Sequence, residues 1–269
     1  MSLAAFLSTH PVFTRGEFVA AHAAASEATG DRAADKALDY AVRTGRVVRV
    51  KRGLYVSVPL GSAPDSLAVD PLLVGSRFAP DAVLSHHSAL ELHGLAQSVL
   101  WTHTVTTNHN VRRTRFRGVE YMGVKPPKAL VAAGRQDEHV MTANRSGLDV
   151  RVTDLERTVV DALDRLELSG GWEEVMRSLD HVRMLDAEAA CDYALLLDQA
   201  ATAAKLGLFL DVHREELLVE QAVLDRLKAV APRHVYRIER GTAQSFRTVP
   251  RWRLSVPEGL FDPAWAELK

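Results

Sequence analysis

The chain has 269 residues, of which 47% are hydrophobic and 25% are charged, and its formal net charge is −1. This apolar content is enough to build a core, which excludes an intrinsically disordered chain, and the length fits two domains. No segment approaches 18 uninterrupted apolar residues and the N-terminus lacks a secretory signal pattern, so we expect a cytoplasmic protein that does not bind membranes. The single cysteine, Cys191, lies in an apolar segment and is expected to be a small buried residue.

The near-neutral net charge conceals an uneven distribution of charge along the chain. Residues 36–60 contain six basic residues and one acidic residue, and residues 101–135 contain seven basic residues and one acidic residue. Residues 149–230, in contrast, contain 18 acidic and nine basic residues. The sequence therefore predicts two basic surfaces and an acidic helical block.

Helical patterns occupy the chain up to Arg43. A short helix is expected over residues 2–8, and Thr14 opens the next one, because Thr14 and Glu17 have the spacing of a capping box. A further helix is expected to begin near Asp31. Its apolar positions recur at helical spacing and should face the core. The side chains left on its outer face are Arg32, Lys36, Tyr40 and Arg43.

A basic β-hairpin is predicted directly after this helix. Two β-branched runs, at residues 47–50 and 54–58, flank a tight turn at residues 51–53. Helix, turn, helix and hairpin in this order are typical of a winged helix-turn-helix, in which a helix enters the major groove and the wing contacts phosphates or the minor groove. The alternative is that these cations only solvate an exposed helix face. The residues assigned to DNA binding are Arg32, Lys36, Tyr40, Arg43, Arg46, Arg49, Lys51 and Arg52.

A second domain is predicted after the Pro- and Gly-bearing residues 59–64, which gives a DNA-binding domain at residues 1–60 and a C-terminal domain at residues 61–269. Ser85 is expected to cap a short helix over residues 86–93, ending at Gly94. Clusters of β-forming residues then predict a small sheet. Its strands are expected at residues 99–107, 118–124, 140–143 and 148–152.

A second basic cluster consists of Arg112, Arg113, Arg115 and Arg117. The last three alternate, so on a strand their side chains would share one face, and that face cannot be apolar core. Such a surface could extend the DNA footprint, bind RNA, dock an acidic partner or simply be solvated. We predict a second patch for nucleic acid or a partner protein here.

The C-terminal third of the chain is predicted to be mostly helical. Thr153 and Glu156 again have capping-box spacing, and the pair formed by Arg157 and Asp161 is interpreted as a solvated i,i+4 ion pair. A final strand at residues 252–256 is expected to rejoin the sheet. The further helices are predicted at residues 172–182, 186–200, 201–212 and 215–230. The fold class is therefore α+β, with an N-terminal winged helix-turn-helix followed by a helix-rich mixed α/β domain.

Catalytic and metal-binding patterns are weak. His86, His87 and His93 lack the i,i+3 or i,i+4 spacing of a zinc pair and are interpreted as packing or hydrogen-bonding residues. Three acids, Asp149, Asp154 and Glu156, could serve a metal-dependent nuclease, although capping of a helix explains Glu156 without a metal. No glycine-rich phosphate loop or nucleophile elbow is present. We therefore expect neither catalytic residues, a metal nor a cofactor.

Several segments, taken in order, resemble the AbiEi family, the antitoxin transcriptional regulators of bacterial type IV toxin-antitoxin systems. They are FTRGEF at residues 13–18, GRVVRVKRGLY at residues 45–55, LSHHSALELHGL at residues 84–95 and TDLERTVVD at residues 153–161. Shorter similarities are GWEE at residues 171–174, AKLGLFL at residues 204–210 and WRL at residues 252–254. The resemblance thus extends over nearly the whole chain.

The resemblance implies a repressor that binds inverted repeats in the promoter of its own operon. It also implies that the C-terminal domain counters a nucleotidyltransferase-like toxin without forming a stable complex with it, and it supplies no catalytic residue. By this resemblance Lys36, Tyr40 and Arg43 lie on the recognition helix, and the wing residues are Arg49, Lys51 and Arg52. Asp31 departs from the expected pattern, because an acid at the start of the recognition helix would repel phosphate.

Two other classes of protein stay open at this point. The first is a transcription factor whose C-terminal domain senses a ligand or a partner. The second is the metal-dependent nuclease considered above.

Overall fold

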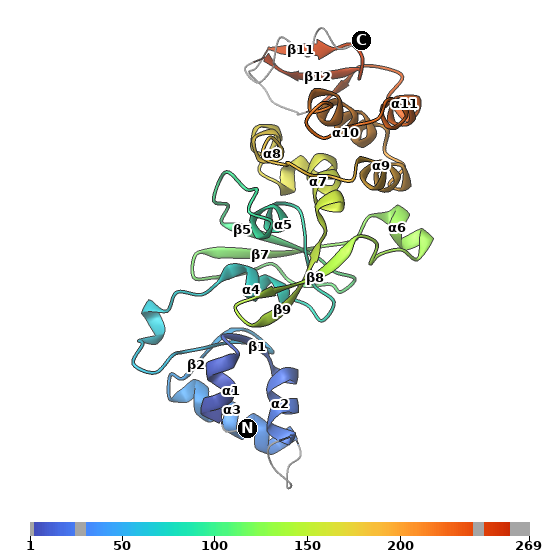
Figure 1. Ribbon diagram of the computed structural model, residues 1–269. Coiled ribbons are helices and arrows are strands. Elements are labelled where there is room, and N and C mark those ends of the chain that lie inside the picture. The colour runs from blue at the N-terminus through green and yellow to red at the C-terminus, as the bar shows by residue number, and fades with distance from the viewer. Residues whose placement is uncertain (1–2, 25–30, 239–244, 259–269) are drawn as a thin grey trace. The chain divides into compact units, whose positions relative to one another are not determined.

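The computed structural model describes residues 3–24, 31–238 and 245–258 (Figure 1). Helices and strands mix throughout this described chain, which gives a mixed α/β fold. Close backbone contacts divide the chain into a first unit, residues 1–83, 101–124 and 142–151, and a second unit, residues 84–100, 125–141 and 152–269. The two units are defined by contacts and need not fold independently, so they do not test the predicted domain boundary at residue 60, which stays a prediction.

The N-terminal part of the first unit consists of helices followed by a β-hairpin, as the sequence predicts. The predicted capping box opens the second helix, where Glu17 N donates to Thr14 Oγ1 over 3.1 Å and Thr14 N donates to Glu17 Oε2 over 2.6 Å. The strands form an antiparallel sheet of order β1-β3-β2. The elements are α1 (Leu3–Thr9), β1 (Val12–Thr14), α2 (Arg15–Ala23), α3 (Asp31–Arg43), β2 (Val47–Lys51) and β3 (Leu54–Ser57).

Aromatic side chains fill the core beneath α3. The Phe6 ring meets Phe13 and Phe18 edge to face, with ring centroids 5.1 and 5.3 Å apart. Ala34 and Leu38 of α3 are buried in the same cluster. Full burial of a large apolar side chain stabilises a fold by about 2 kcal/mol. This core therefore fixes which face of α3 turns toward solvent.

The rest of the first unit includes three neighbouring strands of one sheet, β5, β6 and β7. They are arranged in the order β6-β7-β5, with β5 parallel and β6 antiparallel to β7. A Cβ on Gly123 would lie 2.1 Å from Val111 Cγ2, so only glycine permits this packing. The elements are η1 (Pro64–Ser66), α4 (Pro71–Ser76), β5 (Thr102–Thr106), β6 (Thr114–Phe116) and β7 (Val119–Val124). Strands β4 (Val83–Leu84), β8 (Val140–Arg145) and β9 (Leu148–Thr153) have residues in both units.

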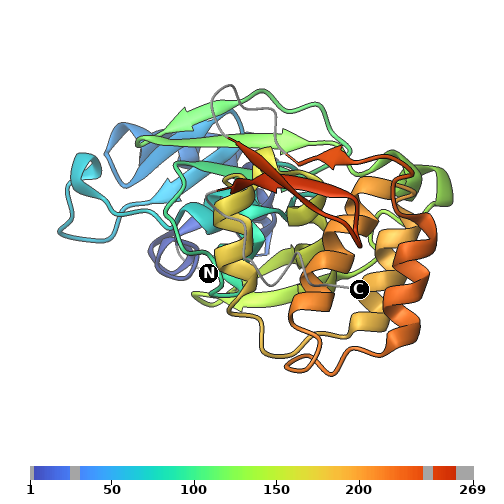
Figure 2. The same ribbon diagram turned by 90° about the horizontal axis from the view of Figure 1, so that it is seen from above.

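The second unit is dominated by helices. Helices α9, α10 and α11, coloured gold to orange, pack against one another (Figure 2). The helices are α5 (His87–Leu92), α6 (Lys128–Ala133), α7 (Leu155–Asp164), η2 (Leu166–Leu168), α8 (Trp172–Leu179), α9 (Ala187–Leu196), α10 (Ala200–Val212) and α11 (Gln221–Val230). The predicted helix over residues 215–230 is therefore too long, because Leu218 adopts φ 53 and α11 begins only at Gln221. None of the described helices is long and apolar enough to cross a membrane.

The C-terminal strands form their own small sheet. Strand β12 (Leu254–Pro257) pairs with β10 (Tyr236–Arg237) and β11 (Phe246–Val249), so the prediction that it rejoins the earlier strands is wrong. Trp252, fully buried, donates from Nε1 to Asp211 Oδ2 over 2.9 Å. A Cβ on Gly207 would lie 2.1 Å from the Trp252 ring. Glycine in α10 thus allows the indole to pack directly against the helix backbone.

The two remaining N-cap predictions are wrong, whereas the end of the short helix at Gly94 agrees with the prediction, since Gly94 has φ 73 directly after the C-cap His93. His86 is the N-cap of α5 and no side chain caps the helix, so Ser85 does not have that role. In α7 the N-cap is Asp154, whose Oδ1 accepts from Arg157 N over 3.0 Å. Thr153, one residue earlier, instead bonds the Thr158 hydroxyl over 2.7 Å in the interior. The capping box expected from Thr153 and Glu156 is therefore absent from this described helix start.

Candidate nucleic-acid interface

The outer face of α3 gathers exposed cations and one aromatic residue. Ala34, Leu38 and Ala41 face the core, so the helix turns the opposite side to solvent, as predicted. Exposed on that side are Arg32, Lys36, Tyr40 and Arg43, with Tyr40 55% exposed. An open depression of about 600 Å³ is lined by Lys36, Asp39, Val42 and Arg43. The face can therefore offer hydrogen-bond donors and an aromatic ring to a partner.

The acids near the start of α3 are held by α2. Arg15 donates from Nε to Asp35 Oδ1 over 2.7 Å and from Nη2 to Asp31 Oδ2 over 3.4 Å. Hydrogen bonding to Arg15 lowers the pKa of Asp35 and raises that of Arg15. The repulsion of phosphate expected from Asp31 is thus partly neutralised inside the protein. Among the described residues, no ion pair engages Arg32, Lys36 or Arg43 in the same way.

The basic hairpin next to α3 divides its cations between two roles. Gly53 forms the turn with φ 81, and the register between β2 and β3 shifts between Arg49 and Lys51. Arg49 and Arg52 are exposed and Arg46 is partly exposed. These three residues can contact a partner.

Lys51 is turned inward instead. Its ammonium donates to the Phe78 carbonyl oxygen over 2.5 Å and lies 3.8 Å from the centroid of the Phe78 ring. Burial lowers the pKa of Lys51. This cation ties the hairpin to the chain that follows α4, a contact that sequence spacing could not indicate.

The second basic cluster does not form the single face expected from alternation. Strand β6 includes only Arg115 of its members. Arg112 and Arg113 precede its first residue, Thr114, and the chain turns at Arg117, which has φ 50. Arg117 Nη1 donates to the Asp65 carbonyl oxygen over 2.8 Å. Arg113 Nη1 lies 3.5 Å from Glu120 Oε2. Arg112 and Arg115 are exposed.

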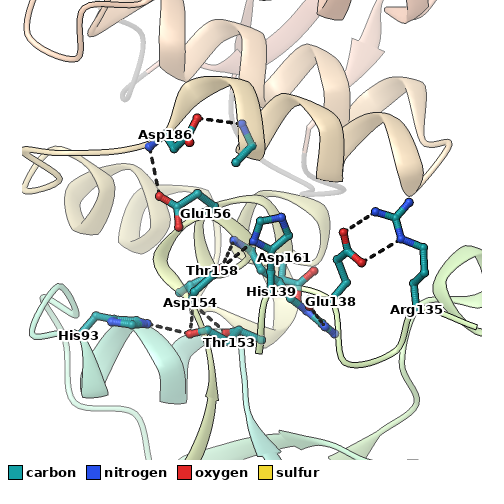
Figure 3. Close-up of polar contacts among 12 residues, drawn as sticks. His93, Arg135, Glu138, His139, Thr153, Asp154, Glu156, Thr158, Asp161 and Asp186 are labelled. Atoms are coloured by element: carbon teal, nitrogen blue, oxygen red, sulfur yellow. Dashed lines mark hydrogen bonds and ion pairs between the residues drawn. The ribbon is translucent and has the colours of Figure 1, made fainter. Parts of the chain in front are cut away.

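Two of the three acids considered for a nuclease, Asp154 and Glu156, have structural partners in the second unit (Figure 3). Asp154, besides capping α7, has its Oδ2 2.7 Å from His139 Nδ1, within hydrogen-bond distance. Glu156 Oε1 accepts from Asp186 N over 3.1 Å. Asp149 belongs to the first unit and is exposed. Within the described residues, no three His, Cys, Asp or Glu side chains come together to hold a metal ion.

The histidines singled out in the sequence have hydrogen-bonding roles, as predicted. His86 Nδ1 lies 3.0 Å from Ser85 Oγ, and both residues are buried. His93 Nε2 bonds the Thr153 carbonyl oxygen over 2.8 Å (Figure 3). His87 Nε2 lies 3.3 Å from Glu174 Oε1. Cys191 is fully buried, which confirms its predicted environment, and burial raises the pKa of its thiol to about 11.

A buried ion pair in α7 replaces the predicted solvated one. The Arg157 and Asp161 side chains are only 0% and 3% exposed, and Arg157 Nε lies 3.1 Å from Asp161 Oδ2. Tyr193 donates its hydroxyl to Asp161 Oδ1 over 2.8 Å. Arg157 Nη1 also donates to the Glu138 carbonyl oxygen over 2.7 Å. These bonds join α7 to α9 and to the chain before β8, so they support a structural role.

The helices, the hairpin and the basic outer face of α3 together fit a DNA-binding domain. Residues 1–58 match a family model described as "Transcriptional regulator, AbiEi antitoxin". The match covers the N-terminal region alone; it agrees with the family resemblance found in the sequence and suggests a regulatory role.

Other comparisons concern the whole chain. A search of curated proteins gave no match. A crystal structure of the RV2827C protein from Mycobacterium tuberculosis is similar, with a TM-score of 0.58 and 16% sequence identity over 94% of this chain and 89% of that one. At 16% identity this similarity shows that the two chains share a fold, and it carries no conclusion about function.

Proposed function

We propose that this protein is a sequence-specific repressor that binds double-stranded DNA through an N-terminal winged helix-turn-helix at residues 1–60. We further propose that it represses its own operon at inverted repeats and acts as the antitoxin against a nucleotidyltransferase-like toxin. The observation that carries the proposal is the outer face of α3, where Arg32, Lys36 and Arg43 are exposed beside Tyr40. The family match of residues 1–58 supports it.

In this proposal α3 is the recognition helix. A helix fits the major groove, where Arg and Lys donate to guanine O6 and N7 and an aromatic ring can touch a thymine methyl group. Lys36, Tyr40 and Arg43 project from successive turns of one face, so they can reach neighbouring bases. Arg15 holds Asp31 and Asp35, which lessens repulsion between the start of α3 and the phosphates.

The β2–β3 hairpin acts as the wing and supplies contacts to phosphate. Arg46, Arg49 and Arg52 are the residues proposed for these contacts, since their side chains reach solvent. Lys51 is not proposed as a phosphate contact, because its ammonium donates to the Phe78 carbonyl oxygen and lies over the Phe78 ring. Arg112 and Arg115 are proposed as a second contact for nucleic acid or an acidic partner, whereas Arg113 and Arg117 have partners within the first unit.

The C-terminal domain at residues 61–269 is proposed to carry the antitoxin activity of a type IV system. In such a system the antitoxin counters its toxin without a stable complex. We propose a non-enzymatic protein that works in the cytoplasm, where it meets both DNA and toxin. The structural roles found for Asp154 and Glu156 favour this over a nuclease.

Selection from a random duplex library, followed by sequencing, tests DNA binding by the full-length protein. The proposal expects enriched sequences with an inverted repeat that also occurs in the protein's own promoter. The variant carrying Arg49→Ala and Arg52→Ala should weaken binding to all sequences and reduce the salt slope by roughly one unit for each phosphate that the hairpin no longer neutralises. An unchanged slope would remove the hairpin from the interface, and a library without enrichment would contradict sequence-specific binding.

Co-expression tests the antitoxin activity separately. A nucleotidyltransferase-like toxin encoded beside this protein should arrest growth, and the full-length antitoxin should restore growth. Lys36→Ala should still restore growth when both genes are expressed from foreign promoters, because the proposed activity against the toxin does not use α3. Failure of the wild-type protein to restore growth would contradict the antitoxin assignment while leaving DNA binding intact.

A further inference from the structure

Strand β6 lies at the end of its sheet. Among the described strands it pairs only with β7, so its other side is an open edge to which a further strand can add. The turn between β6 and β7 consists of Arg117 and Gly118, which both have positive φ, 50 and 81. Such two-residue turns match the natural twist of a hairpin. The edge is therefore held in an extended shape before any partner arrives.

The peptide groups of Arg115 point toward this open edge. Arg115 lies opposite Glu120 of β7. Glu120 N donates to the Trp101 carbonyl oxygen over 2.7 Å, on the side of β5, so the peptide groups of Glu120 turn away from β6. Residues that face each other in an antiparallel pair turn their peptide groups either both inward or both outward. The N–H and C=O of Arg115 therefore point outward, and outside β7 no described residue bonds them.

One face of β6 is positively charged. The Arg115 side chain is exposed and takes part in none of the ion pairs found among the described residues. Glu120, its neighbour across the sheet, has its carboxylate 3.5 Å from Arg113 Nη1 instead. Residues 112–117 contain four arginines and no acid. This face therefore favours an acidic side chain.

The opposite face of β6 is apolar. Phe116 alternates with Arg115 and lies opposite Val119 of β7, and both apolar residues are partly exposed. Together with Leu67 and Pro71 they line a groove of about 430 Å³ in the first unit. A side chain placed opposite Phe116 on a further strand would contact its ring. This face therefore favours an apolar side chain.

We propose that the edge of β6 binds an extended segment of a partner protein in which acidic and apolar residues alternate. The segment adds to the sheet as a further strand, with an acid opposite Arg115 and an apolar residue opposite Phe116. This inference rests on the proposed function, because it selects an acidic protein for the second contact proposed at Arg112 and Arg115.

Two other occupants fit this edge less well. A phosphate has acceptors but no donor, so a nucleic acid backbone would leave the Arg115 C=O unpaired, whereas a peptide strand supplies donor and acceptor together. A second copy of the β6 edge would bring arginines against each other, and like charges on adjacent strands destabilise their pairing.

Anisotropy of a fluorescein-labelled peptide, measured with the full-length protein in the absence of DNA, tests the edge directly. The probe is a seven-residue peptide that alternates glutamate with valine. It should bind about tenfold more tightly than a peptide of the same composition with its glutamates grouped at one end, because two or three cross-strand pairs are worth about that factor. Methyl groups on its backbone nitrogens should weaken binding as much, since they remove the donors. Equal binding of the alternating and grouped peptides would overturn strand addition, and no binding would overturn the site.

A reversal of charge locates the binding. Arg115→Glu should weaken binding of the glutamate peptide by about tenfold and strengthen binding of the matching lysine–valine peptide by a similar factor. Loss of folding cannot produce the second change. Arg233→Glu, an exposed arginine of the second unit, alters the net charge equally and should change neither peptide. Equal effects of the two variants would reduce the binding to net charge and overturn the site.

A duplex separates this inference from DNA binding. Arg115→Glu should leave binding to the duplex enriched by selection within about twofold of the wild type, because only one distant charge contact is removed. A tenfold loss on the duplex would assign the surface to nucleic acid and overturn the protein partner. If the wild-type protein binds no duplex at all, the proposed function fails, and the peptide titration still decides whether the edge of β6 accepts a strand.

Discussion

The buried ion pair of α7 gives a prediction about stability that the sequence alone would have missed. Asp161→Asn keeps the shape of the side chain but removes the charge opposite Arg157, which is 0% exposed. An uncompensated buried guanidinium is costly, and breaking such a pair typically destabilises a protein by about 3 to 5 kcal/mol. The Tyr193 hydroxyl also loses its charged acceptor. We therefore expect a loss of about 3 kcal/mol in the free energy of unfolding.

The chain supplies a matched control for this prediction. Glu173 and Arg177 of α8 form another i,i+4 pair, but their side chains are 50% and 66% exposed. Glu173→Gln should cost less than about 0.5 kcal/mol, because exposed pairs are screened by water. Urea unfolding followed by tryptophan fluorescence measures both variants. Similar small losses in the two variants would refute the reasoning that burial, not spacing, sets the energy.

Three further predictions concern packing, reactivity and pH. Gly207→Ala should destabilise the protein by about 2 to 4 kcal/mol, because its new methyl group would overlap the Trp252 ring. Gly16→Ala has room for the methyl group and should be nearly neutral in the same urea assay. Equal effects of the two substitutions would contradict the packing account. Cys191 should not react with iodoacetamide at pH 8 until the protein unfolds, since its thiol is buried and has a pKa of about 11, and rapid reaction of the native protein would show that it is accessible. Burial lowers the pKa of His86 from 6.5 to about 4, so the unfolded state gains its proton first and stability should fall as the pH drops from 6.5 to 4. His86→Asn should lessen this fall in urea midpoint, and an identical pH profile in that variant would remove His86 as a cause.

Local patterns predicted much of the fold because local contacts determine them. The capping box of Thr14 and Glu17 forms between neighbours in the chain, and the apolar stripe of α3 needs only the helical period. The basic hairpin after Arg43 and several strands could also be predicted, because turn residues and runs of β-forming residues are local signals. These features also located the exposed face of α3, which is the centre of the candidate interface.

Predictions failed where distant residues decide the outcome. Arg157 and Asp161 have the same spacing as a surface pair, and only the packing of α9 against α7 shows that they are buried. Lys51 is drawn inward by Phe78, 27 residues away in the sequence. Arg117 leaves its expected strand and bonds the carbonyl of Asp65. None of these partners leaves a periodic signal in the sequence.

The failed N-cap prediction for α7 has a local cause. Thr153 and Asp154 are both residues that favour the N-cap, and sequence preference does not decide between neighbours. The buried bond between Thr153 and Thr158 occupies the first of them, so the helix start moves to Asp154. Helix α7 therefore starts one residue later than predicted, with Asp154 as its N-cap.

The central claim, that α3 selects the DNA sequence, is tested most directly by comparing one helix variant on two duplexes. Lys36→Ala should weaken binding to the duplex enriched by selection by about 1 to 3 kcal/mol more than binding to a scrambled duplex of the same composition. Lys228→Ala, an exposed lysine on α11, is the control and should change neither affinity. Equal losses of Lys36→Ala on both duplexes would contradict the account and reduce Lys36 to a contact with phosphate.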